Sequence, residues 1–385
     1  MLEKSFHGNK KYWTLVFIMS FFILIGLICF IYQLKYGLIL TGLTRDVPWG
    51  FYISQFTYFV GIGAAGVIVV LPFYIHNRKD FANITILGEF MAVASVMTAM
   101  LFIFVSMGKP SRVFNVIIYA TPHSIIFWDF VVLMTYLFLN LIIGWSVLDL
   151  KRNEAYPPKW VKVLIYISIP WAPLIHIITA FLYSGLPGKE YWHTAIMAPR
   201  FLSSAFASGT SLLVLLSLII KRNTHFDVGE KVLQTLTTVI TYAIIINVFF
   251  FICELFTVFY SQIPDDMNHF KYLFSGINGY SKMVFYMWSS IIFMLLAILL
   301  LLTPYFRRKR SLNIFAFIFI IIGTWIDKGI GNVTGGFIPN SFGYVNEYWP
   351  TSFEILLSLG VYASGFLVLT VLYKIAIEVD NETNL

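Results

Sequence analysis

Four ionisable residues stand within long apolar stretches of this sequence. His176 lies in "PWAPLIHIITAF", Glu254 in "FFFICELF", and the adjacent pair Asp327 and Lys328 in "GTWIDKGIG". A charged side chain in hydrocarbon costs roughly 3 kcal/mol unless it is paired or hydrated. Each of the four is therefore a candidate for function. An imidazole together with a carboxylate can accept and release protons, so the chemistry that these residues favour is proton exchange.

Two further groups of polar residues lie near the ends of apolar stretches. Asp129 follows His123 by six positions in "HSIIFWDF", directly after Trp128. Glu89 lies near the start of "TILGEFMAVASVMTAM" and is followed by Ser95. A carboxylate at the mouth of a helix, with hydroxyl groups further along, could begin a hydrated path for protons.

We therefore predict a proton path that starts at Glu89 and Ser95 and leads toward Asp327 and Lys328. The alternative is that Glu89 lies at the membrane interface and pairs with Arg78 or Lys79, and the sequence leaves both interpretations open.

The elements that position these residues must be membrane-spanning helices. The chain has 59% hydrophobic and only 12% charged residues, with a mean hydropathy of +0.80. Apolar windows of roughly 20 residues, enough to cross the hydrocarbon of a bilayer, recur along it. We predict an all-α integral membrane protein, a single polytopic transmembrane domain over residues 1–385. Its ten spans are 13–36, 51–75, 85–107, 123–148, 160–184, 196–220, 233–260, 282–305, 311–334 and 351–376.

The distribution of basic residues predicts the orientation. Most of the 26 Lys and Arg residues lie near the N-terminus, in the even-numbered loops or near the C-terminus. The positive-inside rule then places both termini in the cytoplasm. The same bias accounts for most of the net charge of +7, so the charge indicates no nucleic-acid partner.

Cysteine usage limits the cofactors that this chain could hold. Cys29 and Cys253 are its two cysteines, and both lie within predicted spans. The sequence has no CxxC or CxxCH motif. We therefore expect neither an iron–sulfur cluster nor a c-type haem bound by this chain alone.

Three loops are similar to one another. "TGLTRDVPW" at 41–49 and "SGLPGKEYWHT" at 184–194 share a hydroxyl residue, Gly-Leu and a Trp at the same spacing, and the loop at 334–351 ends in "EYWPT". They recur every four spans. We therefore predict two parallel four-helix bundles, 51–184 and 196–334, flanked by the spans at 13–36 and 351–376. The alternative is that the Gly and Ser positions are packing surfaces and the aromatic residues form an interfacial belt.

Several motifs together resemble those of a known family. They are "GLTRDVPWGFYIS", "GKPSRVFN", "SIIFWD", "PWAPLIHIITAFLYSGL", and "WIDKG" followed by "EYWPTSFE". With these motifs the chain resembles the polysulfide reductase membrane-subunit (NrfD/PsrC) family. It is most similar to the ten-span DsrP-type quinone-interacting subunits.

The resemblance implies a membrane subunit of a respiratory oxidoreductase, without a redox cofactor of its own, in the cytoplasmic membrane. Such a subunit binds menaquinone or another quinone near the outer face and exchanges electrons with an external ferredoxin-like iron–sulfur subunit. Further cytochrome subunits are a second expected class of partner. On this basis we expect His123, His176, Asp129, Trp128 and Arg112 to bind quinone. His176, Asp129 and Glu254 would be catalytic, in a reaction coupled to proton movement.

Two other functions fit parts of the sequence. A secondary transporter also uses parallel repeats and charges within the membrane, and it would carry broken helices at matching positions. Pro170 and Pro173 could mark one such break. A haem b subunit would need two His residues that face one another, and only His123 and His176 are available near the hydrocarbon.

Overall fold

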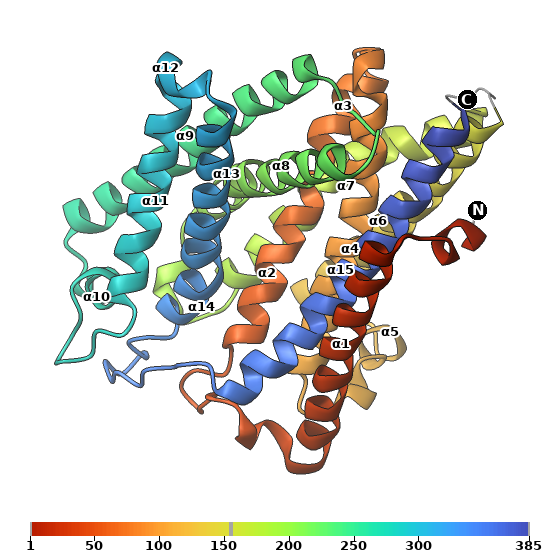
Figure 1. Ribbon diagram of the computed structural model, residues 1–385. Helices are drawn as coiled ribbons and strands as arrows, with labels where there is room; N and C mark the ends of the chain where they lie inside the picture. The colour runs from red at the N-terminus through yellow and green to blue at the C-terminus, as the bar shows by residue number, and fades with distance from the viewer. Residues whose placement is uncertain (1, 154–156, 384–385) are drawn as a thin grey trace.

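The computed structural model describes residues 2–153 and 157–383, and the described chain is helical (Figure 1). Within it, ten helical segments have the length and hydropathy to cross a membrane, which confirms the ten predicted spans. The protein is thus a multi-pass integral membrane protein. The spans are formed by α1 (Lys10–Tyr36), α2 (Phe51–Ala64) with α3 (Val67–Tyr74), α4 (Ala82–Ser106), α6 (Ile125–Arg152), α7 (Lys159–Ser184), α8 (Met197–Asn223), α9 (Glu230–Ser261), α11 (Val284–Leu302), α13 (Arg310–Thr324) with η6 (Trp325–Gly331) and α14 (Asn332–Gly335), and α15 (Ser352–Thr383).

Short helices connect the spans. The longest is α10, which follows α9. It carries Pro at its first position, where the backbone N–H would have no partner within the helix, so its absence costs no hydrogen bond. The short helices are η1 (Leu2–Phe6), η2 (Gly37–Leu40), η3 (Lys79–Phe81), η4 (Pro110–Arg112), α5 (Asn115–Ile118), η5 (Glu190–Trp192), α10 (Pro264–Phe274) and α12 (Pro304–Arg307).

Two spans differ in detail from the predicted continuous helices. The second is divided at Ala65 and Gly66, where backbone bonds from Ala65 to Ile62 and from Gly66 to Gly63 tighten the helix into i→i+3 bonding. The ninth contains the π-helical turn η6, which has one residue more per turn than an α-helix. Hydropathy does not distinguish these variants because each keeps the span apolar.

The helices differ in how much of their surface the protein covers. About three quarters of the most apolar window of α4 is buried (78%), whereas the value for α1 is 11%. The core therefore lies around α2, α4 and α8, and α1 faces lipid on most of its surface. The main packing partner of α1 is α15. Their backbones meet closely, since a Cβ on Gly26 would lie 2.6 Å from the Cα of Gly360.

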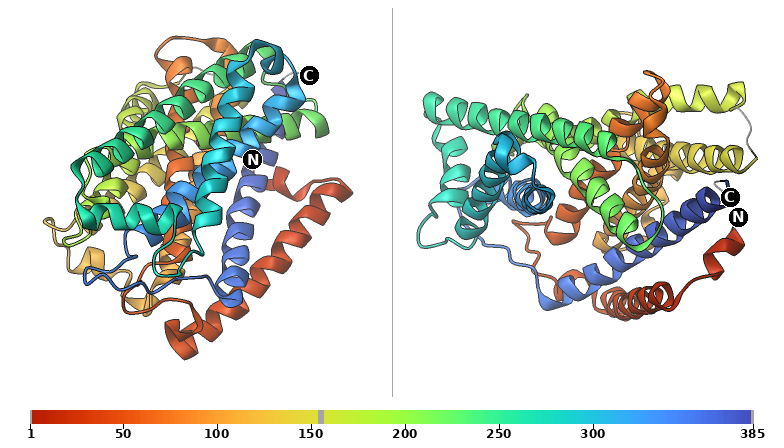
Figure 2. Two further views of the ribbon diagram at one scale, coloured as in Figure 1. Left: turned by 90° about the vertical axis from the view of Figure 1, so that its left-hand side faces the viewer. Right: turned by 45° about the horizontal axis from the view of Figure 1, so that its top comes forward.

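The molecule has two distinct ends, shown in Figures 1 and 2. We call the end that carries Lys151, Arg152, Lys221, Arg222 and the segment 307–310 the basic end. Both termini lie there, and Lys4 forms an ion pair with Glu382. The opposite end, with the loops around Trp49, Trp192 and Trp349, is the tryptophan end.

Helices from the two halves of the chain meet at the centre. α2 packs against α8, α2 also contacts the π-turn η6, and α7 contacts α8. These contacts bring the helices that carry His176, Asp327 and Lys328 to one place. The division into two parallel four-helix bundles stays a prediction.

Candidate functional site

An ion triad joins three helices in the half of the molecule nearer the tryptophan end. Arg200, in the first turn of α8, contacts the carboxylate of Glu254 on α9 through Nη1. Its Nη2 donates to Oδ1 of Asp327 in η6 at 2.6 Å. All three side chains are nearly buried, at 11%, 7% and 4% exposed. Two carboxylates thus share one guanidinium within the span region, and Arg200 also lies over the ring of Phe251.

Sequence reasoning did not single out Arg200. The residue stands in "MAPRF", close enough to a predicted span end to be taken for an interfacial cation. One signal could have pointed to it: the sequence places two carboxylates, Glu254 and Asp327, deep in spans and pairs neither with a cation on another span.

His176 and Lys328 form the second part of the site. Nζ of Lys328 contacts Nε2 of His176 and donates to the carbonyl oxygen of Phe201 at 3.1 Å. The Phe201 ring stacks on the imidazole, with centroids 5.3 Å apart. An ammonium at Lys328 would donate to Nε2, and the ring proton would then stand on Nδ1. Nδ1 is buried and has no hydrogen-bond partner among the described residues, which leaves one donor free for a ligand.

The π-turn positions the adjacent residues Asp327 and Lys328. Successive side chains on a helix point in different directions, and here Asp327 faces Arg200 on α8 while Lys328 faces His176 on α7. Such turns are frequently found at functional sites. On the α2 side, Gly61 leaves the necessary room: a Cβ there would lie 2.8 Å from Nζ of Lys328 and 3.2 Å from Nε2 of His176.

One face of α7 extends the polar site toward the tryptophan end. Thr179, one turn beyond His176, donates through Oγ1 to Oδ1 of Asp129 on α6 at 2.7 Å. Tyr183, a further turn on, has its hydroxyl against Oγ1 of Thr57 on α2. The helical repeat therefore places an imidazole, a hydroxyl bonded to a carboxylate, and a phenol in a row.

An aromatic stack lies beyond Tyr183 at the tryptophan end. Trp49 and Trp192, the tryptophans of the first two similar loops, stack with centroids 6.0 Å apart. Phe337 from the third loop region packs edge-on against both, at 5.8 Å and 5.0 Å. The Nε1 of Trp192 donates to the carbonyl of Asn332 at 3.0 Å. The three loops thus converge on one aromatic structure above the polar face of α7.

A buried carboxylate fixes the loops near α15. Glu354 is fully buried and accepts hydrogen bonds from the backbone N–H of Gly42 (2.8 Å) and of Thr351 (2.9 Å), and from the hydroxyl of Tyr348 (2.6 Å). The Tyr348 oxygen in turn accepts from the N–H of Phe51 at 2.7 Å. Burial and the adjacent Glu354 raise the pKa of Tyr348 above its usual value, so this phenol stays protonated and donates.

Cavities at this site are small. Between Arg200, Asp327, Lys328 and Asn332 lies a volume of about 10 Å³, close to the room that one water molecule needs. A larger one of about 150 Å³ lies beside the aromatic stack and is lined by Trp49, Phe51, Tyr52, Met107 and Glu354, among others. The second cavity has an aromatic wall and a few polar groups, the usual composition of a small-molecule site.

The structure places the predicted residues in three groups. His176, Glu254, Asp327 and Lys328 come together with Arg200, and Asp129 adjoins them through Thr179. His123, Trp128 and Arg112 are exposed instead, on and after the loop between α4 and α6. The indole of Trp128 donates to the carbonyl of Pro122 at 2.8 Å. These three residues lie apart from the charged cluster.

Glu89 and Ser95 form the third group, on α4. Glu89 is 2% exposed and lies two turns into the helix; it has no ion pair with a described residue, and its polar neighbour is the hydroxyl of Tyr74. Arg78 forms its ion pair with Asp80 instead, so the structure does not contain the alternative Glu89–Arg78 pair. Ser95 lines a cavity of about 20 Å³, room for a water molecule.

The arrangement combines groups that bind and exchange protons. His176 has a free ring nitrogen beside an ammonium, Asp129 accepts from one hydroxyl, and Glu254 shares its counter-ion with Asp327. A buried carboxylate with fewer partners than it could accept is suited to taking up a proton. The site therefore fits a reaction in which a small, largely apolar molecule gains or loses protons next to aromatic rings.

Three known proteins are similar to this chain over most of its length. A selenate reductase subunit of Mesobacillus selenatarsenatis is 26% identical, over 92% of this chain and 90% of that protein. A protein of Halobacterium salinarum, provisionally named as a dimethyl sulfoxide reductase membrane subunit, is 25% identical, over 91% and 88%. The Hdr-like menaquinol oxidoreductase integral membrane subunit of Archaeoglobus fulgidus is 24% identical, over 97% and 95%.

The family comparison covers most of the same region. Residues 39–328 match the family model described as polysulphide reductase, NrfD. Four elements build the charged cluster. The matched range contains all of α7, α8 and α9, and it ends at Lys328, within the fourth element, η6. On this match over more than half of its length, the chain belongs to the NrfD polysulphide reductase family.

Proposed function

We propose that this chain is the membrane subunit of a respiratory oxidoreductase complex. It binds menaquinone or another quinone at the tryptophan end and exchanges electrons with a separate iron–sulfur subunit docked there. The observation that carries the proposal is the buried His176, with a free Nδ1, held by Lys328 next to an ion triad and below an aromatic stack. The names of the relatives, reductase subunits and a menaquinol oxidoreductase subunit, support it.

The chemistry of a quinone explains why these residue types are needed. Conversion between quinone and quinol moves two protons and two electrons, so both ring oxygens need partners that hydrogen-bond and exchange protons. His176 and Asp129 would serve these oxygens, and Glu254 would take protons onward. The cavity beside Trp49 and Phe51 supplies flat apolar surfaces near these groups; neither His176 nor Asp129 lines it, so a ring bound there would reach them only after side chains move. The buried Glu354 and Tyr52 add hydrogen-bonding groups to its wall.

The partner would dock on the loops of the tryptophan end. The loop between α14 and α15 exposes Phe342 at 86% and Tyr344 at 69%, large side chains that a partner surface would cover. A ferredoxin-like protein with several clusters would accept or supply the electrons, and cytochrome subunits would extend the complex. Because electrons must leave by tunnelling, the ring has to bind close to this surface.

The orientation belongs to the same proposal. With the basic end in the cytoplasm, the complex lies in the cytoplasmic membrane, both termini are cytoplasmic, and the quinone site is near the outer face. Reporter fusions after Lys151 should then read as cytoplasmic and fusions after Asp266 as external. The opposite pattern would place the partner on the other side of the membrane.

The test uses the purified complex and two histidines of the same end. His176→Ala should lower quinol-linked electron transfer at least about 100-fold, the usual contribution of a positioned acid–base group. The partner subunit should remain bound, as measured by size-exclusion chromatography. His123→Ala is the matched comparison, because His123 is exposed and apart from the cluster.

If His123→Ala abolishes activity and His176→Ala does not, the ring binds at the rim near Trp128 and Arg112. If neither variant changes the rate, the proposed site is wrong.

One observation favours the secondary-transporter alternative. The π-turn η6 and the Pro-containing α7 face each other at the charged cluster, and irregular helices at one depth are typical of transporters. A protein purified without an iron–sulfur partner or extractable quinone, but active in solute uptake into proteoliposomes, would support it. The haem b alternative requires His123 and His176 to face each other, and in the structure they do not.

A further inference from the structure

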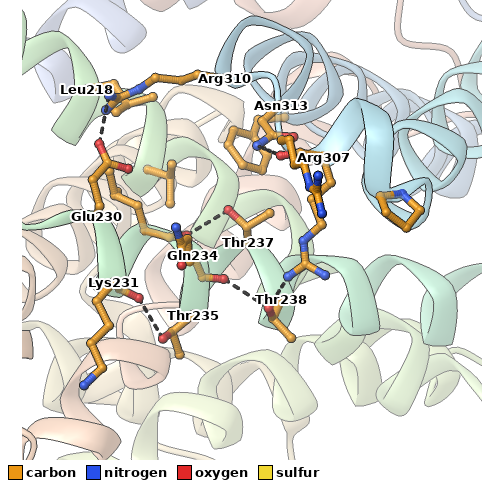
Figure 3. Close-up of a pocket in the computed structure, with 15 residues that line it drawn as sticks. Leu218, Glu230, Lys231, Gln234, Thr235, Thr237, Thr238, Arg307, Arg310 and Asn313 are labelled. Carbon is orange, nitrogen blue, oxygen red and sulfur yellow. Dashed lines mark hydrogen bonds and ion pairs between the residues drawn. The ribbon is translucent and has the colours of Figure 1, made fainter.

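A cavity of about 640 Å³ opens at the basic end, far from the site at the tryptophan end (Figure 3). Glu230, Gln234 and Thr238 line it from successive turns of one face of α9. Arg307 of α12 and Asn313, in the first turn of α13, face them. Neither the quinone site nor the proposed proton path uses this cavity. Its volume falls within the usual range for pockets that hold small molecules.

The rim of the cavity is strongly basic. Among its described lining residues, Lys231, Arg307, Arg308 and Arg310 are cations and Glu230 is the one carboxylate. Arg310 pairs with Glu230 at 3.0 Å, so that carboxylate is already engaged. Arg307 donates to the neutral hydroxyl of Thr238, and neither Arg307 nor Arg308 has an ion pair with a described residue. The rim therefore holds guanidinium charge without a counter-ion, and guanidinium groups match phosphate geometry.

The floor of the same cavity is apolar. Val214 of α8, Leu233 of α9 and Phe317 of α13 line it and are almost completely buried. Next to the cavity, α11 exposes Leu299 and Leu302 on a surface that hydrocarbon would cover. A ligand that fills the cavity therefore needs an anionic head at the rim and an apolar part that continues toward the lipid.

We propose that this cavity binds the phosphodiester headgroup of an anionic glycerophospholipid, with Arg307 and Arg308 on the phosphate. A free phosphate ion shares the charge chemistry but leaves the apolar floor uncovered. Basic pockets between transmembrane helices are known to hold such headgroups. Gln234 and Thr238 would add neutral hydrogen bonds to the head, and the acyl chains would lie along the exposed face of α11.

The test measures lipid binding by native mass spectrometry on the delipidated protein or its complex. Wild-type protein should bind phosphatidylglycerol at least about tenfold more tightly than phosphatidylethanolamine, and Arg307→Gln with Arg308→Gln should remove that preference. Lys10→Gln with Lys11→Gln is the matched control, because both lysines are exposed at the start of α1 and lie outside the cavity. That control should keep wild-type binding.

Two results would overturn the proposal. The first is that the lysine control and the arginine variant lose phosphatidylglycerol binding equally, which would show a general effect of surface charge. The other is displacement of the lipid by millimolar inorganic phosphate, which would show a site for a soluble anion. Arg307→Lys with Arg308→Lys is the folding control: it keeps both charges and should retain part of the binding, because an ammonium attracts phosphate but lacks the guanidinium fork.

Discussion

At the scale of single residues, the ion triad determines how the charged cluster can be probed. Arg200 is the shared ion-pair partner of two carboxylates, so removal of its charge leaves Glu254 and Asp327 buried together. Breaking a buried ion pair by removing one partner typically costs about 3–5 kcal/mol. Arg200→Gln should therefore strongly lower the thermal stability of the protein in detergent, measured by the unfolding temperature.

The same triad supplies its own control. Adding Glu254→Gln and Asp327→Asn to Arg200→Gln removes all three charges while nearly keeping their shapes. The triple variant should recover much of the lost stability, since no uncompensated charge remains. A triple variant less stable than Arg200→Gln alone would show that the shape of the site, and not its charge, holds the helices together.

Gly61 offers a test of the space around His176. The added methyl group of Gly61→Ala would lie 2.8 Å from Nζ of Lys328, too close without a shift of that side chain. On the proposed function, displacing the His176–Lys328 contact should lower quinol-linked turnover roughly 10- to 100-fold. Gly108→Ala, whose nearest neighbour would be Leu38 at 3.6 Å, should leave the rate unchanged. If both variants turn over at the same rate, the His176–Lys328 contact is not needed for turnover.

Sequence reasoning identified the deep ionisable residues but not their partners. Hydropathy marks His176, Glu254, Asp327 and Lys328 because a polar residue stands out in an apolar run. Arg200 and Glu354 do not stand out, since each lies at the end of a span where polar residues are common. Only the packing of α8 against α9 and η6 shows that Arg200 turns inward.

At the scale of elements, α10 fastens the loop that follows the π-turn region. His269 on α10 donates from Nδ1 to the carbonyl oxygens of Gly335 (2.7 Å) and Ile338 (3.1 Å). Burial lowers the pKa of His269 below its usual value, although these two carbonyls favour the charged ring. The ring is therefore neutral in the folded protein at neutral pH.

The depressed pKa of His269 gives stability a defined pH dependence. The unfolded chain binds the proton more readily, so the stabilising contribution is present above the ordinary imidazole pKa and is lost as pH falls through the folded value. Between about pH 7.5 and about pH 5, the unfolding temperature of the wild type should fall more than that of His269→Gln, which does not titrate. Parallel pH profiles of the two proteins would contradict this assignment.

The spans themselves were well predicted, because a run of apolar residues of membrane length has few other uses. Their internal irregularities were not. The π-turn lies where Asp327 and Lys328 find partners on two different helices. A local pattern of hydropathy cannot predict those partners, because they lie on helices that are distant in the sequence.

At the scale of the whole molecule, the proposed function requires a route for protons from the basic end to the proposed quinone site. Glu89 is buried near the basic end without an ion pair to a described residue, and Ser95 and Thr98 follow on the same helix, beside a cavity large enough for water. These positions support the predicted path, with Glu89 as its first carboxylate. The distance to Asp327 and Lys328 would have to be covered by water.

Glu89→Gln keeps the shape of the side chain and removes its titratable proton. In proteoliposomes with the complete complex, this variant should lose most of the membrane-potential signal that accompanies turnover, because charge can no longer be drawn from the basic end. Asp227→Asn is the matched control, since Asp227 lies in a loop at the same end and pairs with Lys221. A wild-type signal in Glu89→Gln would exclude this path.

The pairing of α1 with α15 also constrains how the protein is made. α1 is made before the other nine described spans, yet most of its surface is uncovered and its main partner, α15, is made after them. Gly26 and Gly360 bring the two backbones too close for any other residue pair to replace them without a shift. During synthesis, α1 can already meet α2 and α4, because Gln33 bonds to Tyr52 and to the carbonyl oxygen of Val105, but it lacks its main partner until α15 has been translated. A chain interrupted before Ser352 would therefore leave the Gly26 face of α1 unpacked.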